Sequence, residues 1–300
     1  MDAMICCMVR SRLFLPKLES PPSTILDYMS SHFPHIPRAA WQDRMERGLV
    51  TTSTGVQVKE SSPYAHGLTV FYAREVLSEP STVEAESILF RDDEILIADK
   101  PHGMPVTPAG EHVSRSLLVR LQEQTGLDAL VPLHRLDRDT AGLVLFGIKV
   151  DSRRKYHQLF ADGAMEREYE AVARVGDCPE ETSWLVENRL TAGDPWFRRR
   201  ISDGEPVNAV TAINLIDTRD GLGLFHLRPR TGKKHQLRVH MAAIGFPILG
   251  DNFYPEIHQP PQQTPLQLLA SRLSFADPLT GTPREFKSER RLLHGWQPAS

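Results

Sequence analysis

The stretch "HRLDRDTAGL" (134–143) carries two arginines and two aspartates before it turns apolar, and "LVLFGIK" (143–149) continues as a buried strand. Asp137 therefore lies in irregular backbone directly before a rigid element, where catalytic side chains commonly lie. We expect its carboxylate to be ionised, because the neighbouring Arg135 and Arg138 favour the charged form. Such a group serves as a nucleophile or an electrostatic stabiliser. Alternatively, it belongs to an Arg–Asp network that only holds a turn.

Composition and length limit the class of protein. A chain of 300 residues, 40% of them hydrophobic, is expected to form about two domains around a sizeable core. It contains no apolar run of the roughly 18–20 residues that a membrane span requires. The stretch "MICCMV" (4–9) is too short for a signal peptide. The sequence therefore predicts a cytoplasmic protein that has no membrane segment.

Cysteines and histidines show neither a disulfide framework nor the spacing of a metal centre. Cys6 and Cys7 are adjacent and Cys178 stands alone, while His235 and His240 are too far apart in sequence to share one helix face. The sequence also lacks glycine-rich nucleotide loops and the G-x-S-x-G, H-E-x-x-H and C-x-x-C motifs. We therefore expect no metal and no cofactor, and a reaction centred on one carboxylate.

Charge is distributed unevenly, although the formal net charge is only −3. Residues 75–99 carry eight acidic residues and one basic residue, whereas residues 189–240 carry ten Lys or Arg and five Asp or Glu. The net charge alone argues against a nucleic-acid partner. The basic C-terminal half nevertheless allows a cationic binding face.

Breaks in the hydrophobic pattern divide the chain. We expect, in order, a disordered lead-in (1–20), a small module (21–75), a linker (76–87) and a larger domain (88–295). In the small module, Thr24 is a candidate N-cap for one helix and Pro37 begins a second. Residues 49–59 alternate around a turn, which indicates a hairpin, and residues 68–75 are expected to form a strand.

The larger domain is predicted to contain many strands and a few helices. Beyond the strand of 143–149, strands are expected on both sides of the charged turn within 87–101 and at 166–175, 207–216 and 222–228. Helices are expected at 114–126 with Ser114 as cap, at 151–163 with Asp151 as cap, and at 231–245 opened by Thr231. Strands and helices alternate too rarely for a doubly wound sheet.

The segment "RPRTGKKHQLRVH" (228–240) combines a predicted helix start with several basic residues. A helix opened by Thr231 places Lys233 and Lys234 in its first turn, where cations oppose the helix dipole. A bound anion reverses that cost, so the pattern predicts a phosphate site. A solvated basic patch is the alternative. One turn further along, Arg238 is placed to reach a buried carboxylate.

Two further features concern aromatic and basic side chains. Tyr169 shares one face of its strand with Ala171 and Ala173. It either packs in the core or offers its ring to a flat ligand, because its small neighbours leave room. The basic run "FRRRIS" (197–202) is expected on a loop, either as a solvated surface or as a contact to a phosphate chain.

Several spaced stretches carry a family resemblance. They are, in order, "DKPHGMPV" (99–106), "HRLDRDTAGL" (134–143), "EREYEAV" (166–172), "LRPRTGKKHQLRVHMAAIGFPILGD" (227–251) and "LLASRLSFADPLTG" (268–281). With them the chain resembles the RluA family of RNA pseudouridine synthases over most of its larger domain, and the leading module resembles an S4-like RNA-binding domain. The resemblance implies an α+β fold, with a mixed, mainly antiparallel sheet in the catalytic domain.

The resemblance also implies roles for particular residues. Asp137 falls on the family's catalytic aspartate, Tyr169 on the tyrosine that stacks on the target base, and Arg238 on the basic residue that pairs with the aspartate. Arg135 falls on the arginine that fills the gap left by the flipped base, and Leu237 on a residue that lines the base pocket. The other implied RNA- or substrate-binding residues are His134, Leu136, Lys233, Lys234, His235 and Gln236. At position 233 the family more often has Arg, whose bidentate fork a lysine lacks.

The sequence thus predicts a cofactor-free isomerase that converts specific uridines in structured RNA to pseudouridine, with ribosomal RNA preferred to transfer RNA. The expected partner is RNA and the expected state is a monomer. One alternative is a catalytically silent RNA-binding or ribosome-assembly protein, which needs no Asp137 facing Arg238. Another is a glycoside or nucleoside hydrolase, which usually needs a second carboxylate, such as Asp139.

Overall fold

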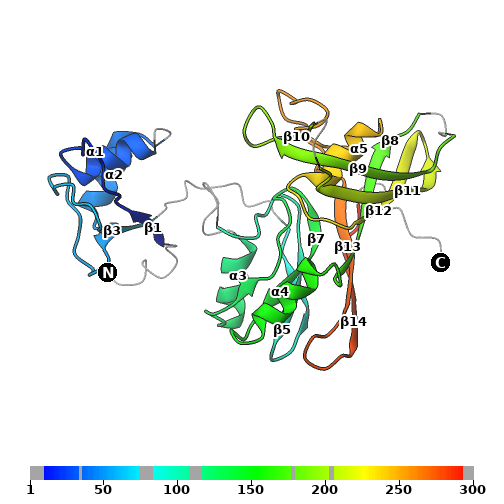
Figure 1. The fold of residues 1–300 in the computed structure, drawn as a ribbon, viewed down its shortest axis with the longest axis horizontal. Helices are drawn as coiled ribbons and strands as arrows, with labels where there is room; N and C mark the ends of the chain where they lie inside the picture. Colours follow the sequence, from blue (N-terminus) through cyan, green and yellow to red (C-terminus); the bar gives the residue numbers. More distant parts are fainter. Residues whose placement is uncertain are drawn as a thin grey trace. The chain divides into compact units, whose positions relative to one another are not determined.

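A computed structural model of the protein describes residues 10–33, 36–73, 84–108, 116–176, 180–202 and 206–292. Contacts divide the chain into two compact units, one of residues 1–79 with 108–114 and one of residues 80–107 with 115–300 (Figure 1). No helix of the described ranges is both long and apolar enough to cross a membrane. The described residues do not include Cys6, Cys7, Ser114, Cys178 or most of the predicted linker.

The smaller unit contains two helices and a three-stranded antiparallel sheet around one apolar core. Its elements are β1 (Arg10–Phe14), α1 (Ile25–His32), α2 (Arg38–Glu46), β2 (Val50–Thr52) and β3 (Thr69–Ala73), and the sheet order is β1-β3-β2. Thr24 caps α1 as predicted, in a reciprocal capping box with Asp27. Trp41 of α2 is fully buried in the core.

Two expectations for this unit need correction. The expectation of a disordered lead-in over 1–20 is wrong for residues 10–14, because β1 pairs along its whole length with β3. The partner lies far along the chain, so the local pattern gave no sign of the pairing. The hairpin expected over 49–59 is reduced to β2 and one bridge between Thr51 and Gln57. The assignment of this unit as S4-like remains a prediction.

The larger unit is built on one eleven-stranded sheet. Its strands are β4 (Ser87–Arg91), β5 (Ile95–Lys100), β6 (Val131–Pro132), β7 (Ala141–Gly147), β8 (Glu166–Arg174), β9 (Ser183–Ala192), β10 (Arg199–Ser202), β11 (Ala209–Arg219), β12 (Leu222–Pro229), β13 (Leu268–Ala276) and β14 (Pro283–Lys287). Their order is β10-β9-β11-β12-β8-β13-β7-β5-β4, with β14 beside β13 and β6 beside β7. All neighbours are antiparallel except β13 and β7. The predicted α+β class is therefore confirmed.

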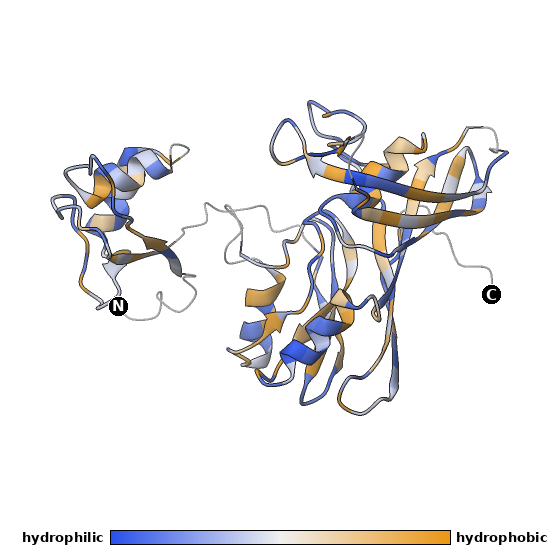
Figure 2. Cartoon of the chain, in the orientation of Figure 1, coloured by the Kyte–Doolittle hydropathy of each residue, from blue (hydrophilic) through white to orange (hydrophobic). Residues whose placement is uncertain are grey.

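Helices α3 (Leu117–Thr125) and α4 (Arg153–Ala161) cover opposite faces of β5 and β7. Val144 of β7 shares one core cluster with Leu117 of α3, and Leu143 shares another with Tyr156 of α4. In Figure 2 hydrophobic residues run along the strands of this sheet, whereas the side of α4 that faces the viewer is hydrophilic. Strand β7, which was predicted as a buried strand after "HRLDRD", is thus buried on both faces.

The starts of these two helices differ slightly from expectation. The Ser116 side chain caps α3 by accepting a hydrogen bond from the backbone N–H of Val119, two residues after the predicted cap. Ser152, rather than Asp151, is the N-cap residue of α4. Gly126 ends α3 in the left-handed conformation that glycine adopts readily.

Helix α5 spans Gln236–Ala243 and begins five residues later than predicted. The Thr231 hydroxyl does not cap it, because this oxygen accepts the backbone N–H of Val210 in β11 and donates to the Gln236 side chain. Lys233 and Lys234 therefore lie in a loop before the helix. The helix-dipole argument for a phosphate site at these lysines fails, although their charges remain.

Gly142, in the stretch "HRLDRDTAGL" (134–143), allows β7 to lie close to β13. Its φ is +108°, and a Cβ at this position would overlap the carbonyl oxygen of Ala270 in β13. Glycine is therefore required where β7 and β13 run parallel. Ala270 is in turn in register with Tyr169 of β8. Strand β13 therefore lies between β7, which follows Asp137, and β8, which carries the predicted stacking Tyr169. Ala270 of β13 is in register with a residue of each.

Candidate active site

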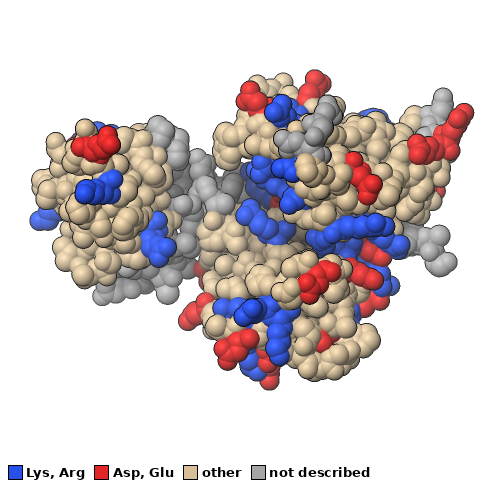
Figure 3. All heavy atoms as spheres, viewed as in Figure 1, with Lys and Arg blue, Asp and Glu red and all other residues tan. Residues whose placement is uncertain are grey.

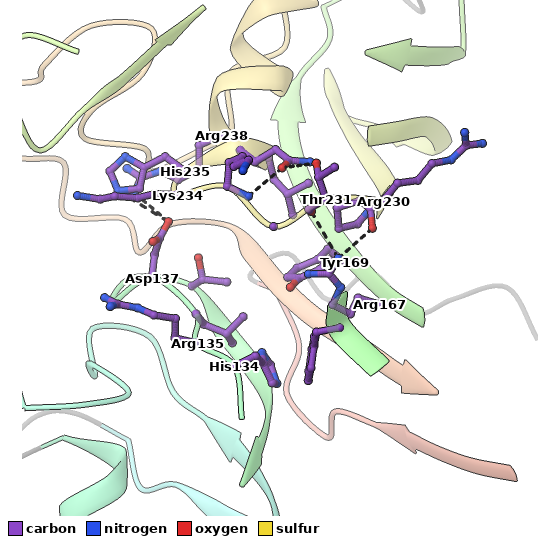
Figure 4. A pocket seen from close by; sticks show the side chains of 18 of the residues that line it. His134, Arg135, Asp137, Arg167, Tyr169, Arg230, Thr231, Lys234, His235 and Arg238 are labelled. Atoms are coloured by element: carbon purple, nitrogen blue, oxygen red, sulfur yellow. Dashed lines mark hydrogen bonds and ion pairs between the residues drawn. The ribbon is translucent and has the colours of Figure 1, made fainter. Parts of the chain in front are cut away.

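A cavity of about 880 Å³ lies in the larger unit, between the loop before β7 and the segment that leads into α5 (Figure 4). All eleven residues predicted from sequence line it: His134, Arg135, Leu136, Asp137, Tyr169, Lys233, Lys234, His235, Gln236, Leu237 and Arg238. Segments that are far apart in sequence therefore meet around one space.

The lining of this cavity is strongly cationic. Seven of the described lining residues are Lys or Arg, namely Arg135, Arg167, Arg199, Arg230, Lys233, Lys234 and Arg238, and the one carboxylate is Asp137. Figure 3 shows Lys and Arg gathered across the middle of the larger unit, between the part with β9–β12 and the part with α3 and α4. This local field attracts anions despite the net negative charge of the chain.

Asp137 projects from its loop toward the opposite wall, where Lys234 and His235 lie (Figure 4). Its Oδ2 is 3.8 Å from His235 Nε2 and 3.9 Å from Arg238 Nη1, and 27% of its side chain is exposed. Neither distance is that of a hydrogen bond. The turn itself contains a different ion pair, because Arg138 Nε lies 2.9 Å from Asp139 Oδ1. Asp137 is therefore not locked into the turn's own Arg–Asp pair.

Electrostatics at Asp137 are a balance of opposing effects. Burial raises the pKa of this carboxyl above its ordinary value, and the positive charges of Arg238, Lys234 and Arg135 act in the lowering direction. The expectation that Arg135 and Arg138 keep the group ionised is thus incomplete. Arg238 and Lys234, from the opposite wall, favour the charged form more than the sequence neighbours do.

Arg238 is fixed by a residue that the sequence did not single out. Its Nε and Nη2 donate to the two carboxylate oxygens of Asp251 at 2.8 and 2.6 Å, and both side chains are almost fully buried. The backbone N–H groups of Phe253 and Tyr254 also donate to Asp251. The predicted pairing of Arg238 with Asp137 is present as an ion pair at 3.9 Å. The hydrogen-bonded partner of Arg238 is Asp251, a buried carboxylate of the kind that the sequence placed within its reach.

His235 and Gln236 serve mainly to shape the loop. The Gln236 amide donates to Val210 O and Thr211 Oγ1, and its oxygen accepts from Thr231 Oγ1 and the backbone N–H of Lys233. Its hydrogen-bonding groups are therefore used within the protein. Gln236 still lines the cavity, and its contact with the substrate stays a prediction. His235 has a left-handed backbone with φ of +57°, an uncommon conformation for a residue other than glycine.

The His235 ring is held neutral beside the carboxylate. Its Nδ1 is 2.9 Å from the Tyr254 hydroxyl, and its ring stacks on Phe253 with 5.9 Å between centroids. Burial, with the charges of Arg238 and Lys234 acting the same way, lowers its pKa to about 3. His235 therefore presents a polar but uncharged edge to Asp137.

His134 also supports the fold at the edge of the cavity. Its Nε2 accepts a hydrogen bond of 3.0 Å from the backbone N–H of Leu145 in β7, and its ring lies against Phe160. Burial lowers its pKa to about 3, so the ring is neutral. This use of Nε2 makes His134 a residue that positions the Asp137 loop.

Tyr169 occupies the floor of the cavity. Its side chain is 8% exposed and belongs to the main core cluster, and burial raises the pKa of its phenol. The neighbouring Arg167 donates to the carbonyl oxygens of Pro229 and Thr231 at 3.3 and 3.4 Å. Core packing and pocket lining, which the sequence offered as alternatives, are thus combined in one residue.

Lys100 explains why the stretch 99–106 accompanies the aspartate motif. It is fully buried, and its Nζ donates to the carbonyl oxygens of Pro101, Met104 and Arg138 at 2.8–3.0 Å. Burial lowers its pKa to about 7. The lysine therefore ties the Asp137 loop to β5. In the sequence, the one indication of this role is that Lys100 lies within the stretch 99–106, which carries part of the family resemblance.

Comparison with known proteins places the chain in a family. Residues 94–243 match the RNA pseudouridylate synthase domain. An uncharacterized RNA pseudouridine synthase of Synechocystis is 33% identical, with alignment over 77% of this chain and 79% of the relative. The dual-specificity RNA pseudouridine synthase RluA of Escherichia coli is 31% identical over 67% of this chain and 91% of its own length.

Solved structures agree at the level of the fold. Human RNA pseudouridylate synthase domain containing 1 superposes with a TM-score of 0.59 at 21% identity, over 71% of this chain and 86% of its own. The chain belongs to the RNA pseudouridine synthases, and it is of the RluA type. It is therefore an isomerase that acts on RNA.

Proposed function

We propose that this enzyme isomerises specific uridines of structured RNA with Asp137 as its catalytic carboxylate and without a cofactor. One observation carries the proposal: Asp137 is accessible, lacks a hydrogen-bonded cation among the described residues, and faces Arg238 at 3.9 Å in a cationic cavity. A charged carboxylate in such a place is available to a substrate rather than to the fold.

The target nucleotide has to leave its stack before it reaches Asp137. A uridine inside a helix hides C1′ from any side chain, so the base is flipped out or taken from a loop. In the proposal, the exposed Arg135 at the cavity mouth occupies the space that the base leaves. The ring of Tyr169 then receives the uracil, with Leu136 and Leu237 as apolar lining.

The chemistry begins with the ionised form of Asp137. It cleaves the N1–C1′ bond either by attack on C1′ or by removal of the C2′ proton. The freed uracil turns within the cavity and bonds to C1′ through C5. This step breaks the bond between C1′ and Asp137 in the first route, and is accompanied by return of the proton from Asp137 to C2′ in the second. C5 then loses a proton and N1 gains one. The raised pKa of Tyr169 keeps its phenol protonated at neutral pH, which favours water over a tyrosinate as the base for the C5 proton.

Arg238 acts on this reaction through its charge and its fixed position. Its bidentate bond to Asp251 prevents it from closing onto Asp137, while its Nη1 still favours the charged form of that carboxylate. A cation held in place before the substrate arrives needs no reorganisation during the reaction.

A carboxylate-driven hydrolase is less well supported. Such enzymes usually use a second carboxyl group as acid or base, and Asp137 is the one carboxylate among the described cavity-lining residues. The candidate partner Asp139 forms an ion pair with Arg138. The basic lining suits a polyanionic substrate instead.

We place ribosomal RNA before transfer RNA as the substrate. Ribosomal large subunit pseudouridine synthase D of Zymomonas mobilis is 27% identical over 87% of this chain and 88% of its own length. The Escherichia coli relative RluA is named a dual-specificity enzyme, so both RNA classes belong in the test.

The test uses RNA from cells that lack this protein. Ribosomal and transfer RNA are incubated separately with the purified enzyme, and new pseudouridine is mapped. Asp137→Asn is expected to abolish product while leaving RNA binding intact, and Asp151→Asn, at an exposed position, serves as the matched control. Near-normal turnover by Asp137→Asn would overturn the catalytic assignment, and product in transfer RNA alone would overturn the substrate preference.

A further inference from the structure

Trp196 lies in the turn between β9 and β10 and is 80% exposed, more than any other large apolar side chain among the described residues. Single exposed apolar residues are common and carry no meaning alone. At Trp196, however, the turn is braced, the neighbourhood is cationic, and the ring lies near Lys234, whose charge acts on Asp137.

The turn is held rigidly on its inner side. Phe197 packs on Phe253 with 5.2 Å between centroids, and the Arg198 guanidinium lies 5.0 Å from the Tyr254 ring and donates to the Pro255 carbonyl at 2.6 Å. The backbone N–H of Arg199 donates to the Tyr254 hydroxyl at 2.6 Å. The indole is thus presented by a fixed support.

One lysine connects this ring to the active site. Lys234 Nζ lies 5.7 Å from the Trp196 ring centroid, and the charge of Lys234 acts directly on Asp137. Phe253, behind the turn, also lies 5.0 Å from the Arg238 guanidinium. Trp196 is therefore adjacent to the wall of the cavity that receives the target base.

The charge around Trp196 determines the kind of partner. Arg199 and Arg200 follow it on β10, and neither has an ion-pair partner in the described part of the chain, whereas Asp194 is the turn's single acid. This also corrects the prediction of a loop over 197–202, because most of that run is strand β10. An aromatic face with unpaired cations beside it fits a stacked nucleobase and its phosphates.

We propose that Trp196 is a second stacking site, which holds a base flanking the target uridine while Lys234 contacts the phosphate backbone between the two. The inference rests on the proposed RNA substrate and extends it to single-stranded nucleotides next to the target. Stacking on an aromatic ring tolerates any base, so the site adds affinity and register without reading sequence.

The test measures binding of a fluorescein-labelled seven-nucleotide oligouridylate, and of the same backbone without bases, at low salt. Trp196→Ala is expected to weaken oligouridylate binding roughly five- to hundredfold and to leave binding of the baseless backbone nearly unchanged. Trp196→Phe should restore most of the affinity. Leu185→Ala, at a 56% exposed position on β9, is the matched control and should have no effect.

Equal losses for both oligomers, or no loss for either, would overturn the inference. So would loss of self-association by Trp196→Ala in sedimentation with oligouridylate binding intact, because the ring would then cover a second protein chain. Pseudouridine formation is assayed in parallel. Activity without dependence of binding on Trp196 rejects this site alone, and Trp196-dependent binding without activity rejects the proposed reaction alone.

Discussion

Asp137 and Asp251 lie on different edges of one buried guanidinium. Asp251 takes the Nε–Nη2 edge of Arg238 in two hydrogen bonds, and Asp137 lies 3.9 Å from Nη1. Asp251 therefore neutralises and immobilises the arginine. Asp137 interacts with the positive charge of Arg238 without a hydrogen bond. This division separates the carboxylate that holds the site together from the one that is available for chemistry.

Removal of Asp251 should damage the fold as well as the activity. Asp251→Ala leaves the Arg238 charge buried without its hydrogen-bonded partner, which typically costs about 3–5 kcal/mol in the free energy of unfolding. Urea denaturation followed by circular dichroism measures this loss. Asp151→Ala, at an exposed position, should change stability by no more than about 0.5 kcal/mol. Equal stability of the two variants would contradict the role given to Asp251.

Asp137→Asn should raise stability at neutral pH. The folded-state pKa of Asp137 is raised by burial, so the carboxyl stabilises the fold only when protonated, and this contribution is lost as pH rises through that pKa. The asparagine variant escapes the loss. Its melting temperature should exceed that of the wild type at pH 7, and the difference should shrink at acid pH. A lower melting temperature at pH 7 would mean that the cations outweigh burial.

The acid limb of the activity profile should respond to Lys234. In the proposed reaction Asp137 acts in its ionised form, so the turnover number is expected to fall as pH drops through its raised pKa. Lys234 favours the ionised form, and Lys234→Met should therefore move the limb to higher pH. Turnover is measured against pH at saturating RNA, with the exposed Lys155→Met as control. A limb that stays in place, or moves to lower pH, would contradict this coupling.

The loop lysines should contribute to affinity mainly through counterion release. Lys233→Gln and Lys234→Gln should each lower RNA affinity about equally for different sequences and reduce the slope of log affinity against log salt by about 0.7–0.9. Filter binding across a salt series measures the slope. Lys155→Gln, which carries the same charge change on the exposed side of α4, should leave it unaltered. An unchanged slope in the loop variants would rule out contact with phosphate.

Local sequence predicted the components of the site better than their contacts. The turn before a buried strand pointed to Asp137, and the basic segment pointed to Arg238. Asp251 and Tyr254 escaped notice because their roles depend on contacts with Arg238 and His235, which no local pattern encodes. Long-range contacts of this kind arise from the fold as a whole.

The errors have a similar origin. Thr231 has the chemistry of a helix cap, but β11 and Gln236 use its hydroxyl, so α5 starts at Gln236. Residues 10–14 look like a tail until β3 provides a partner. A capping hydroxyl or an edge strand can form hydrogen bonds with partners anywhere in the chain. The local sequence shows only the nearby partners. By contrast, β7, with its continuous apolar run, was predictable because nothing else suits such a segment.

The position of Ala270 between Gly142 and Tyr169 has an evolutionary consequence. Main-chain pairing, which the lack of a side chain at Gly142 permits, sets the gap between the aspartate loop and the tyrosine strand. Descendants of this chain can therefore exchange the residues of surface turns, including the one that carries Trp196, without altering that gap. New RNA targets become accessible through changes at the periphery, while the geometry of the reaction is inherited with the backbone.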